Sequence, residues 1–212
     1  MDFNDFSQRI SKIKNLPLPG PESHYKMAPE ERINTMQAIE LKRKNAKKAA
    51  VMALFYPNQS SNTNLLLILR KSYKGVHSNQ IGFPGGKVEK EDKDLLHTAL
   101  RETFEEVGVL PQAVKVIRSL TELYIPPSNF EVQPYVGLYP VVSPFKIQES
   151  EVEALVEVSL DEFMDDNTVI YQKLTTSYAQ NIDVPAFKLN GYTVWGATAM
   201  MLSEVKELFK QV

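Results

Sequence analysis

Cysteine is absent from this chain of 212 residues. Its absence excludes disulfide bonds, thiolate metal sites and a cysteine nucleophile. The longest apolar runs, such as residues 49–56, are far too short to span a bilayer. The N-terminal residues lack the charged and then apolar pattern of a secretory signal. We therefore expect a cytoplasmic protein that does not act at a membrane.

An excess of charge of either sign is also missing. Lysine and arginine number 24, aspartate and glutamate 26, which gives a formal net charge of -2. Such a balance gives no general attraction to nucleic acid. The length and the hydrophobic content of 43% are enough for one sizeable domain with a buried core. We expect a globular protein with no nucleic-acid partner.

We expect an N-terminal helical extension over residues 1–45 and a larger domain over residues 46–212. The extension contains a short helix at 2–14, a proline-rich break at 16–21 and a polar helical stretch at 29–48. The domain mixes expected strands and helices, the strands at 50–56, 64–70, 114–124, 131–142 and 152–158, the helices at 93–107 and 197–210. This mixture favours an α/β or α+β sandwich.

Three carboxylates crowd one turn of the helix expected at residues 93–107. Glu102, Glu105 and Glu106 lie three and four positions apart, so their Cβ atoms would be roughly 5–6 Å from each other. Two unit charges about 6 Å apart repel by roughly 3 kcal/mol at an effective dielectric constant of about 20. Hard divalent cations relieve such repulsion, and Mg²⁺ usually binds one or two carboxylates together with substrate phosphates. The cluster therefore predicts a metal site.

Residues 101–109, RETFEEVGV, resemble the second half of the Nudix hydrolase signature, G-x5-E-x7-R-E-U-x-E-E-x-G-U, in which U is a bulky apolar residue. Thr103 takes the place of the first apolar residue. The first half departs from the signature, because Asp92 stands six residues after Gly86, where glutamate is expected. Eight residues, rather than seven, then separate Asp92 from Arg101. This departure is similar to one branch of the family, the coenzyme A pyrophosphatases.

Further segments look like that branch. Residues 66–70, LLILR, followed by residues 80–86, QIGFPGG, resemble its additional upstream motif. Gly75 and Asn79 stand between them, in a stretch where the branch often has an arginine and a glycine. Other similar segments are PSNFEVQPYVG at 127–137, Glu151-Val152, and WGATA at 195–199. The resemblance covers roughly residues 48–205 and implies a Nudix-type α/β/α sandwich with a mixed β-sheet between helices.

The resemblance also implies roles for the acidic residues. Glu102, Glu105 and Glu106 would bind Mg²⁺ or Mn²⁺ and take part in catalysis. Nudix enzymes commonly take a further acidic ligand or general base from a distant loop or strand, and Glu151 aligns with a family glutamate. Glu149 and Glu153 are close in sequence and compete for this role. In the absence of metal, mutual repulsion should raise the pKa of some of these carboxyl groups.

Basic residues and glycines complete the expected site. Arg101 is expected to orient its carboxylate neighbours, because a guanidinium holds two carboxylate oxygens at fixed geometry. Gly85 and Gly86 would let a carbonyl and a substrate phosphate approach the metal. Arg70 either meets an anionic group of the substrate or forms a structural salt bridge. His77 either binds a substrate phosphate or closes a loop.

As a function, the resemblance implies metal-dependent hydrolysis of the diphosphate linkage of coenzyme A or acyl-coenzyme A, giving 3′,5′-ADP and 4′-phosphopantetheine. One alternative is a Nudix pyrophosphatase acting on ADP-ribose, a dinucleotide or another nucleoside diphosphate derivative. A second is a non-catalytic, nucleotide-sensing Nudix domain, which the retained glutamates disfavour. In each case the partner is a small nucleotide molecule. The resemblance and the N-terminal extension suggest a homodimer.

Overall fold

The structure is a computed structural model, and it describes residues 1–34, 43, 45–71, 79–142, 145–174 and 181–212. The helices of the described residues are α1 (Phe3–Ile10), η1 (Ser11–Asn15), α2 (Pro21–Tyr25), α3 (Glu30–Asn34), α5 (Leu95–Val107), η2 (Pro111–Ala113), α6 (Leu160–Met164), η3 (Asp166–Thr168) and α7 (Gly196–Phe209), where η marks a short 3₁₀ helix. None of the helices in these ranges is both long and apolar enough to cross a bilayer.

The strands of the described residues form two sheets. The larger sheet has eight strands: β1 (Lys47–Pro57), β2 (Thr63–Arg70), β3 (Ile81–Gly82), β4 (Gly85–Lys87), β5 (Lys115–Ser119), β6 (Leu123–Ile125), β7 (Phe130–Leu138) and β8 (Val152–Ser159). The smaller sheet has three strands: β9 (Val169–Leu174), β10 (Ile182–Leu189) and β11 (Tyr192–Trp195).

Strand β1 is the centre of the larger sheet. It runs parallel to β7 along nine residue pairs and antiparallel to both β2 and β4, so the sheet is mixed. β2 pairs with the C-terminal half of β1, whereas β4 pairs with residues Ala49, Ala50 and Val51. The short β4 therefore lies where the sheet has room beside the start of β1, and this placement brings its two glycines to the site described below.

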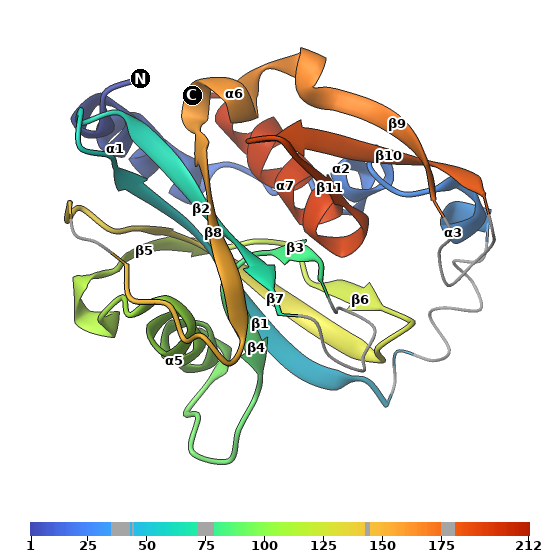
Figure 1. Ribbon diagram of the computed structural model, residues 1–212, viewed down its shortest axis with the longest axis horizontal. Coiled ribbons are helices and arrows are strands. Elements are labelled where there is room, and N and C mark those ends of the chain that lie inside the picture. Colours follow the sequence, from blue (N-terminus) through green and yellow to red (C-terminus); the bar gives the residue numbers. More distant parts are fainter. Residues whose placement is uncertain (35–42, 44, 72–78, 143–144, 175–180) are drawn as a thin grey trace.

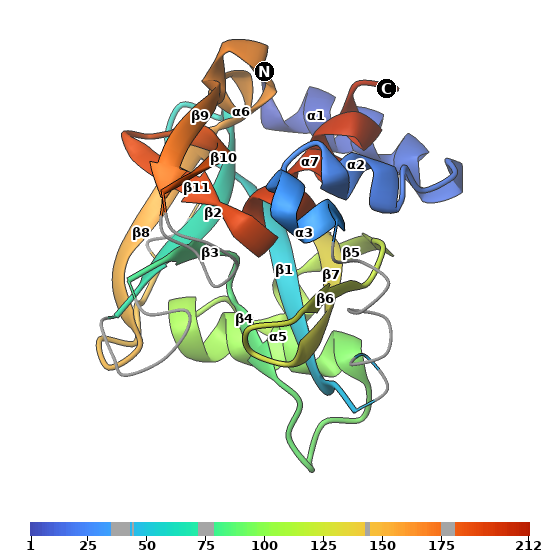
Figure 2. The same ribbon diagram turned by 90° about the vertical axis from the view of Figure 1, so that its right-hand side faces the viewer.

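The two faces of the sheet carry separate hydrophobic clusters. In β1, alternate side chains point to opposite faces. One set contacts the cluster that contains α1 and α7, and its β1 members are Ala49, Val51, Ala53 and Phe55. The other set contacts the cluster under α5, and its β1 members are Ala50, Met52, Leu54 and Tyr56. Figures 1 and 2 show α5 on one side of the sheet and α1, α2 and α7 on the other. The expected sandwich of a mixed sheet between helices is confirmed.

The N-terminal segment packs onto the same core. Phe6 of α1 contacts Phe55 of β1 and Phe209 of α7, with ring centroids 5.2 and 5.4 Å apart. Arg118 of β5 donates to the carbonyl oxygens of Ile13 and Leu16. These contacts replace solvent on one face of the sheet with the residues that precede β1. The division at residues 45 and 46 stays a prediction.

The elements differ from the sequence expectation in several places. The run at 114–124 is broken into β5 and β6, and residues 47–48 belong to β1 rather than to the preceding helical stretch. The small sheet β9–β11 was not expected from the sequence. Its edge strand β9 is largely exposed, so its side chains do not show the buried alternation on which strand prediction depends.

Candidate metal centre

Helix α5 is fixed at both ends. The carboxylate of Asp94 accepts a hydrogen bond from the backbone N–H of His97 at 2.7 Å, which caps the first turn. At the other end Gly108 adopts a left-handed conformation with φ 75°, and its N–H bonds to the carbonyl of Phe104 at 2.8 Å. The last turn of α5, which carries the acidic residues, is thus held at a defined position beneath β1 and β4.

Glu106 is the most buried of these acidic residues, with 1% of its surface exposed. Its Oε2 accepts from the N–H of Gly85 at 2.8 Å, and its Oε1 accepts from Nη1 of Arg70 at 3.0 Å. Nη2 of Arg70 in turn donates to the carbonyl oxygen of Gly85 at 2.6 Å. Of the two roles expected for Arg70, the structural salt bridge is present. The three residues form a closed unit that joins α5, β2 and β4.

Burial raises the pKa of Glu106 to about 7. The Arg70 charge and the Gly85 N–H oppose this shift, whereas the charges of Glu102 and Glu151 add to it. The pKa of Glu102 is also raised, first by burial and then by Glu105 and Glu151, against the opposing effect of Arg101. Mutual repulsion among these groups was expected from the sequence, and a bound cation would relieve it.

Gly86 leaves room for the Glu102 carboxylate. A Cβ atom at residue 86 would lie 2.4 Å from Cδ and 2.5 Å from each carboxylate oxygen of Glu102, closer than van der Waals contact allows. At Gly85, a Cβ would lie 2.4 Å from the carbonyl oxygen of Ala50, and φ is 148°. Both glycines are therefore required by close approach, one to a side chain of α5 and the other to the backbone of β1.

Arg101 connects the carboxylates around it. Its Nε and Nη2 donate to the two oxygens of Asp92, each at 2.9 Å, and its Nη1 donates to Glu102 and Glu105, each at 3.0 Å. Asp92 also accepts from the hydroxyl of Thr98 and the N–H of Glu89. The Arg101 hydrogen bonds hold the pKa of Asp92 well below its usual range. Asp92 therefore anchors Arg101. The sequence pattern alone did not predict this role for Asp92.

The structure separates Glu151 from its two neighbours in sequence. The charge of Glu151 acts on both Glu102 and Glu106. Glu153 instead lies 3.9 Å from the ammonium group of Lys71, and that ammonium group also donates to the carbonyl oxygen of Glu149. Glu151 lies in the turn before β8, and its backbone carbonyl oxygen accepts a hydrogen bond from the backbone N–H of Lys71. The role of Glu151 as a further ligand or base stays a prediction, and its charge effect on Glu102 and Glu106 supports it.

The donor set suits a hard divalent cation. Glu102, Glu105, Glu106 and Glu151 offer only oxygen atoms, as Mg²⁺ and Mn²⁺ prefer. A carboxylate has about four lone-pair sites, so Glu106 keeps acceptor capacity beyond its two hydrogen bonds. Within the described ranges, no three acidic or histidine side chains converge into a preformed cage. The fit therefore depends on the chemistry of the donors and on the space that Gly86 leaves beside Glu102.

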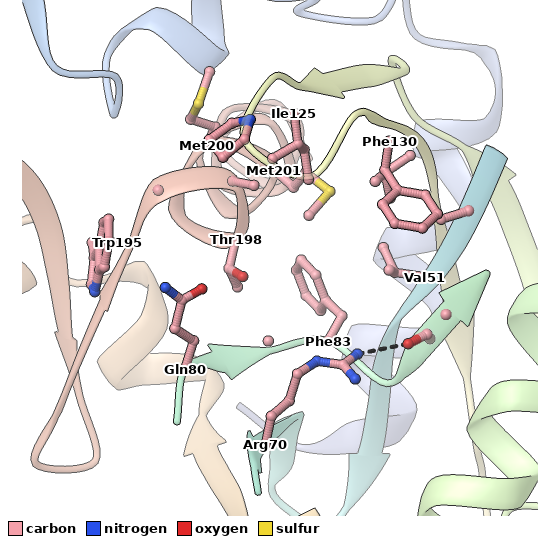
Figure 3. A pocket seen from close by; sticks show the side chains of 18 of the residues that line it. Val51, Arg70, Gln80, Phe83, Ile125, Phe130, Trp195, Thr198, Met200 and Met201 are labelled. Carbon is pink, nitrogen blue, oxygen red and sulfur yellow. Dashed lines mark hydrogen bonds between the residues drawn. The ribbon is translucent and has the colours of Figure 1, made fainter. Parts of the chain in front are cut away.

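A cavity of about 550 Å³ begins at this site. Arg70, Gly85 and Gly86 border one part of it, and the rest is mainly apolar, with walls that include Phe83 and Met201. Figure 3 shows Arg70 and Phe83 reaching into the cavity from one side and Thr198 and Met201 from the other. The cavity has the size and the composition of a small-molecule site.

The sequence analysis missed much of this cavity wall. Pro29 and Arg32 come from the N-terminal segment, and Val184, residues 195–198, Met200 and Met201 from the C-terminal part. The apolar pattern of α7 predicted burial, but nothing in it distinguished a cavity wall from ordinary core. Of the expected substrate-binding residues, Arg70, Gly85 and Gly86 lie at the cavity, whereas His77 lies outside the described residues.

The chain is similar in sequence to known proteins. Residues 46–177 match the family model described as the NUDIX domain. Among curated relatives, proteins named uncharacterized Nudix hydrolase NudL from Salmonella paratyphi B and Salmonella newport are 37% identical over 146 residues, which cover 66% of this chain and 72% of each relative.

Solved structures show the same fold. The Nudix hydrolase RenU of M. smegmatis has a TM-score of 0.54 at 14% identity, over 79% of this chain and 88% of that one. A MutT protein from Methanosarcina mazei Go1 has a TM-score of 0.51 at 16% identity, over 79% of this chain and 99% of that one.

Proposed function

Because this chain belongs to the Nudix family and is a hydrolase of that family, we propose that it cleaves the diphosphate linkage of coenzyme A or acyl-coenzyme A. The products are 3′,5′-ADP and 4′-phosphopantetheine or its acyl derivative. One observation carries the choice of substrate. The segments that resemble the coenzyme A branch, residues 66–70 and 80–86, supply Arg70, Gln80 and Phe83 to the cavity, together with its glycines.

The reaction requires water to attack a phosphorus atom of the diphosphate. Divalent cations bound by Glu102, Glu105, Glu106 and Glu151 would polarise a phosphoryl oxygen and lower the pKa of the attacking water. The chain's own contribution is positional. Arg70 and the Gly85 N–H hold Glu106, and Arg101 holds Glu102 and Glu105. A carboxylate accepts the proton of the water, and we assign this role to Glu151, which comes from a loop rather than from α5.

The glycines act on the substrate side of the site. Gly85 and Gly86 border the cavity and have no side chain that would hold the diphosphate away from the carboxylates. The apolar remainder of the cavity excludes water from the non-reacting part of the substrate, which strengthens the polar contacts inside. The scissile linkage would therefore lie in the cavity, beside the glycines of β4 and within reach of the acidic turn of α5.

Product analysis tests the proposal. The purified protein is incubated with Mg²⁺ and, separately, coenzyme A, dephospho-coenzyme A, ADP-ribose and NADH, and the products are separated by chromatography. We expect 3′,5′-ADP from coenzyme A and much slower turnover of the dephospho form, because coenzyme A alone among the four carries the 3′-phosphate. Faster cleavage of ADP-ribose or NADH would replace coenzyme A with another nucleoside diphosphate derivative. The matched control is the same incubation with EDTA, in which no product is expected.

A homodimer stays a prediction, and sedimentation of the same preparation tests it.

A further inference from the structure

The far wall of the cavity is built from the two ends of the chain. Pro29 and Arg32 precede the part that matches the family model, and Thr198, Met200 and Met201 follow it. The matched part supplies the metal-binding side, through β1, β2 and β4. Contacts that hold these two segments together therefore also set the width of the cavity. They do so at the wall that faces the metal-binding side.

A buried polar network joins these two ends. His24 of α2 is 2% exposed and Glu204 of α7 is fully buried. The ring Nε2 of His24 lies 3.0 Å from Oε2 of Glu204. The same carboxylate accepts from the hydroxyl of Thr121 at 2.6 Å and from its N–H at 3.1 Å. Three segments, α2, α7 and the loop before β6, thus meet at one carboxylate.

The Glu204 carboxylate is ionised, as its role as a hydrogen-bond acceptor requires. Burial alone would raise the pKa of Glu204, but the hydrogen bonds from His24 and Thr121 outweigh it, and the pKa is lowered. Glu204 is then ionised at neutral pH, so Nε2 of His24 is the donor. A buried hydrogen-bonded carboxylate is weak evidence for stability, because the cost of its desolvation offsets the attraction of its partners. Its better supported effect is to select one arrangement of the elements that it joins.

His24 and Glu204 are each close in sequence to residues that line the cavity. Glu204 follows Met200 and Met201 by four and three residues, so each methionine is its neighbour one turn earlier in α7. His24 precedes Pro29 by five residues. A smaller cavity of about 100 Å³ is lined by His24, Arg32 and Met200, which shows that these wall residues adjoin the network.

We propose that His24 and Glu204 are positioning residues of the substrate site, which hold the N-terminal segment against α7 so that the far wall fits the non-reacting part of the substrate. They do not touch the reacting atoms. The proposal rests on the proposed function only in that the cavity holds the substrate. It makes the N-terminal segment a part of the specificity wall, and it predicts an effect on KM rather than on kcat.

Steady-state kinetics test this with His24→Leu, using coenzyme A or whichever of the four compounds above the wild type cleaves. We expect KM to rise about tenfold, with kcat within about twofold of the wild type. His24→Gln keeps a side-chain N–H donor and should restore KM to within about twofold. Lys26→Ala is the matched control, because Lys26, the residue after α2, forms an ion pair with Glu207 of α7 that is more exposed than the contact between His24 and Glu204. It should leave both constants unchanged.

A second measurement does not depend on activity. Trp195 is the single tryptophan of the chain and lines the cavity just before α7. Quenching of its fluorescence by acrylamide should increase in His24→Leu and stay unchanged in Lys26→Ala. If His24→Leu does not fold, Glu204→Gln replaces it, because it removes the charge and keeps the size. Unchanged KM and unchanged quenching in a folded variant would overturn the proposal, and so would a fall in kcat alone. Failure of the substrate assignment would appear instead as absence of coenzyme A cleavage by the wild type.

Discussion

Asp92 and Arg101 are joined by two hydrogen bonds of 2.9 Å, from Nε to Oδ1 and from Nη2 to Oδ2. The Asp92 side chain is fully buried, and Arg101 uses its remaining Nη1 for Glu102 and Glu105. Asp92 stands where the signature has the longer glutamate, and one extra residue separates it from Arg101. The structure shows that Asp92 nevertheless anchors this arginine. These two hydrogen bonds fix the guanidinium of Arg101, which in turn holds Glu102 and Glu105, two of the proposed metal ligands.

Replacing Asp92 tests this anchor. Asp92→Asn keeps the shape but removes the charge, so we expect the free energy of unfolding to fall by about 2 kcal/mol at pH 7. Because folding lowers the pKa of Asp92, its stabilisation is complete above the ordinary value of about 3.9 and is lost as the pH falls further. Urea unfolding at pH 7 and pH 3 should thus show a smaller difference between variant and wild type at pH 3. An equal difference at both values would contradict the role of the charge.

Glu106→Gln tests the buried acidic residue. The amide keeps the size of the side chain but binds a cation weakly, and it leaves Arg70 without a charged partner. We expect kcat to fall by roughly 100-fold or more, because a bound cation supplies several kcal/mol of transition-state stabilisation. Circular dichroism should show an intact fold. Full activity in this variant would rule out the metal assignment.

Gly86→Ala tests the space beside Glu102. The new Cβ would lie 2.4 Å from Cδ of Glu102, so this side chain must move, whereas residue 86 itself does not have a left-handed backbone. We expect affinity for Mn²⁺ to fall roughly tenfold, as for other displaced groups around a metal. Calorimetric titration measures the affinity, and thermal unfolding checks that the fold is retained. Wild-type affinity would show that Glu102 is not a ligand.

Glu151→Gln and Glu153→Gln form a matched pair. The two residues are exposed and two positions apart, but the charge of Glu151 helps to raise the pKa of Glu102 and Glu106, whereas Glu153 lies 3.9 Å from the ammonium group of Lys71. We expect a roughly tenfold loss of Mn²⁺ affinity or a comparable loss of kcat for Glu151→Gln. Glu153→Gln should change neither. The reverse result would transfer the role to Glu153.

Phe6→Ala tests whether the N-terminal segment shares the core. Phe6 is 4% exposed and its ring contacts Phe55 and Phe209. Its truncation should lower the free energy of unfolding by about 3–4 kcal/mol, through lost burial and the cavity left behind. The control is Tyr171→Ala, an aromatic residue that is 73% exposed, for which a change within about 0.5 kcal/mol is expected. Similar small losses in both variants would mark the segment as an appendage, and urea unfolding decides between the two.

Local pattern predicted the acidic turn well. The spacing of Glu102, Glu105 and Glu106 and the stop at Gly108 depend only on helical geometry within one short segment, and the structure has α5 ending at Val107. The function of Asp92 was not predictable in the same way. It lies before the helix, in a turn whose conformation sets how far its side chain reaches, and the signature alone gives no geometry for a changed spacing.

Contacts between distant segments explain the other misses. The sequence left Arg70 between two roles, because its partner Glu106 lies 36 residues away and meets it only through the register of β1 with β2 and β4. The sequence likewise could not separate Glu151 from Glu149 and Glu153, because Glu102 and Glu106 lie more than 40 residues away from all three. The network of His24 and Glu204 spans 180 residues, and no periodic signal in either segment indicates it.

By itself the sequence determined the family resemblance, the helix that carries the acidic residues and the glycines that precede it, because these features depend on residues a few positions apart. The tertiary structure alone decided which side chains hold those acidic residues in place. It also decided that the two ends of the chain close the cavity. The physical reason is that such contacts follow from sheet register and from the packing of helices on its two faces, which bring together residues that no local pattern connects.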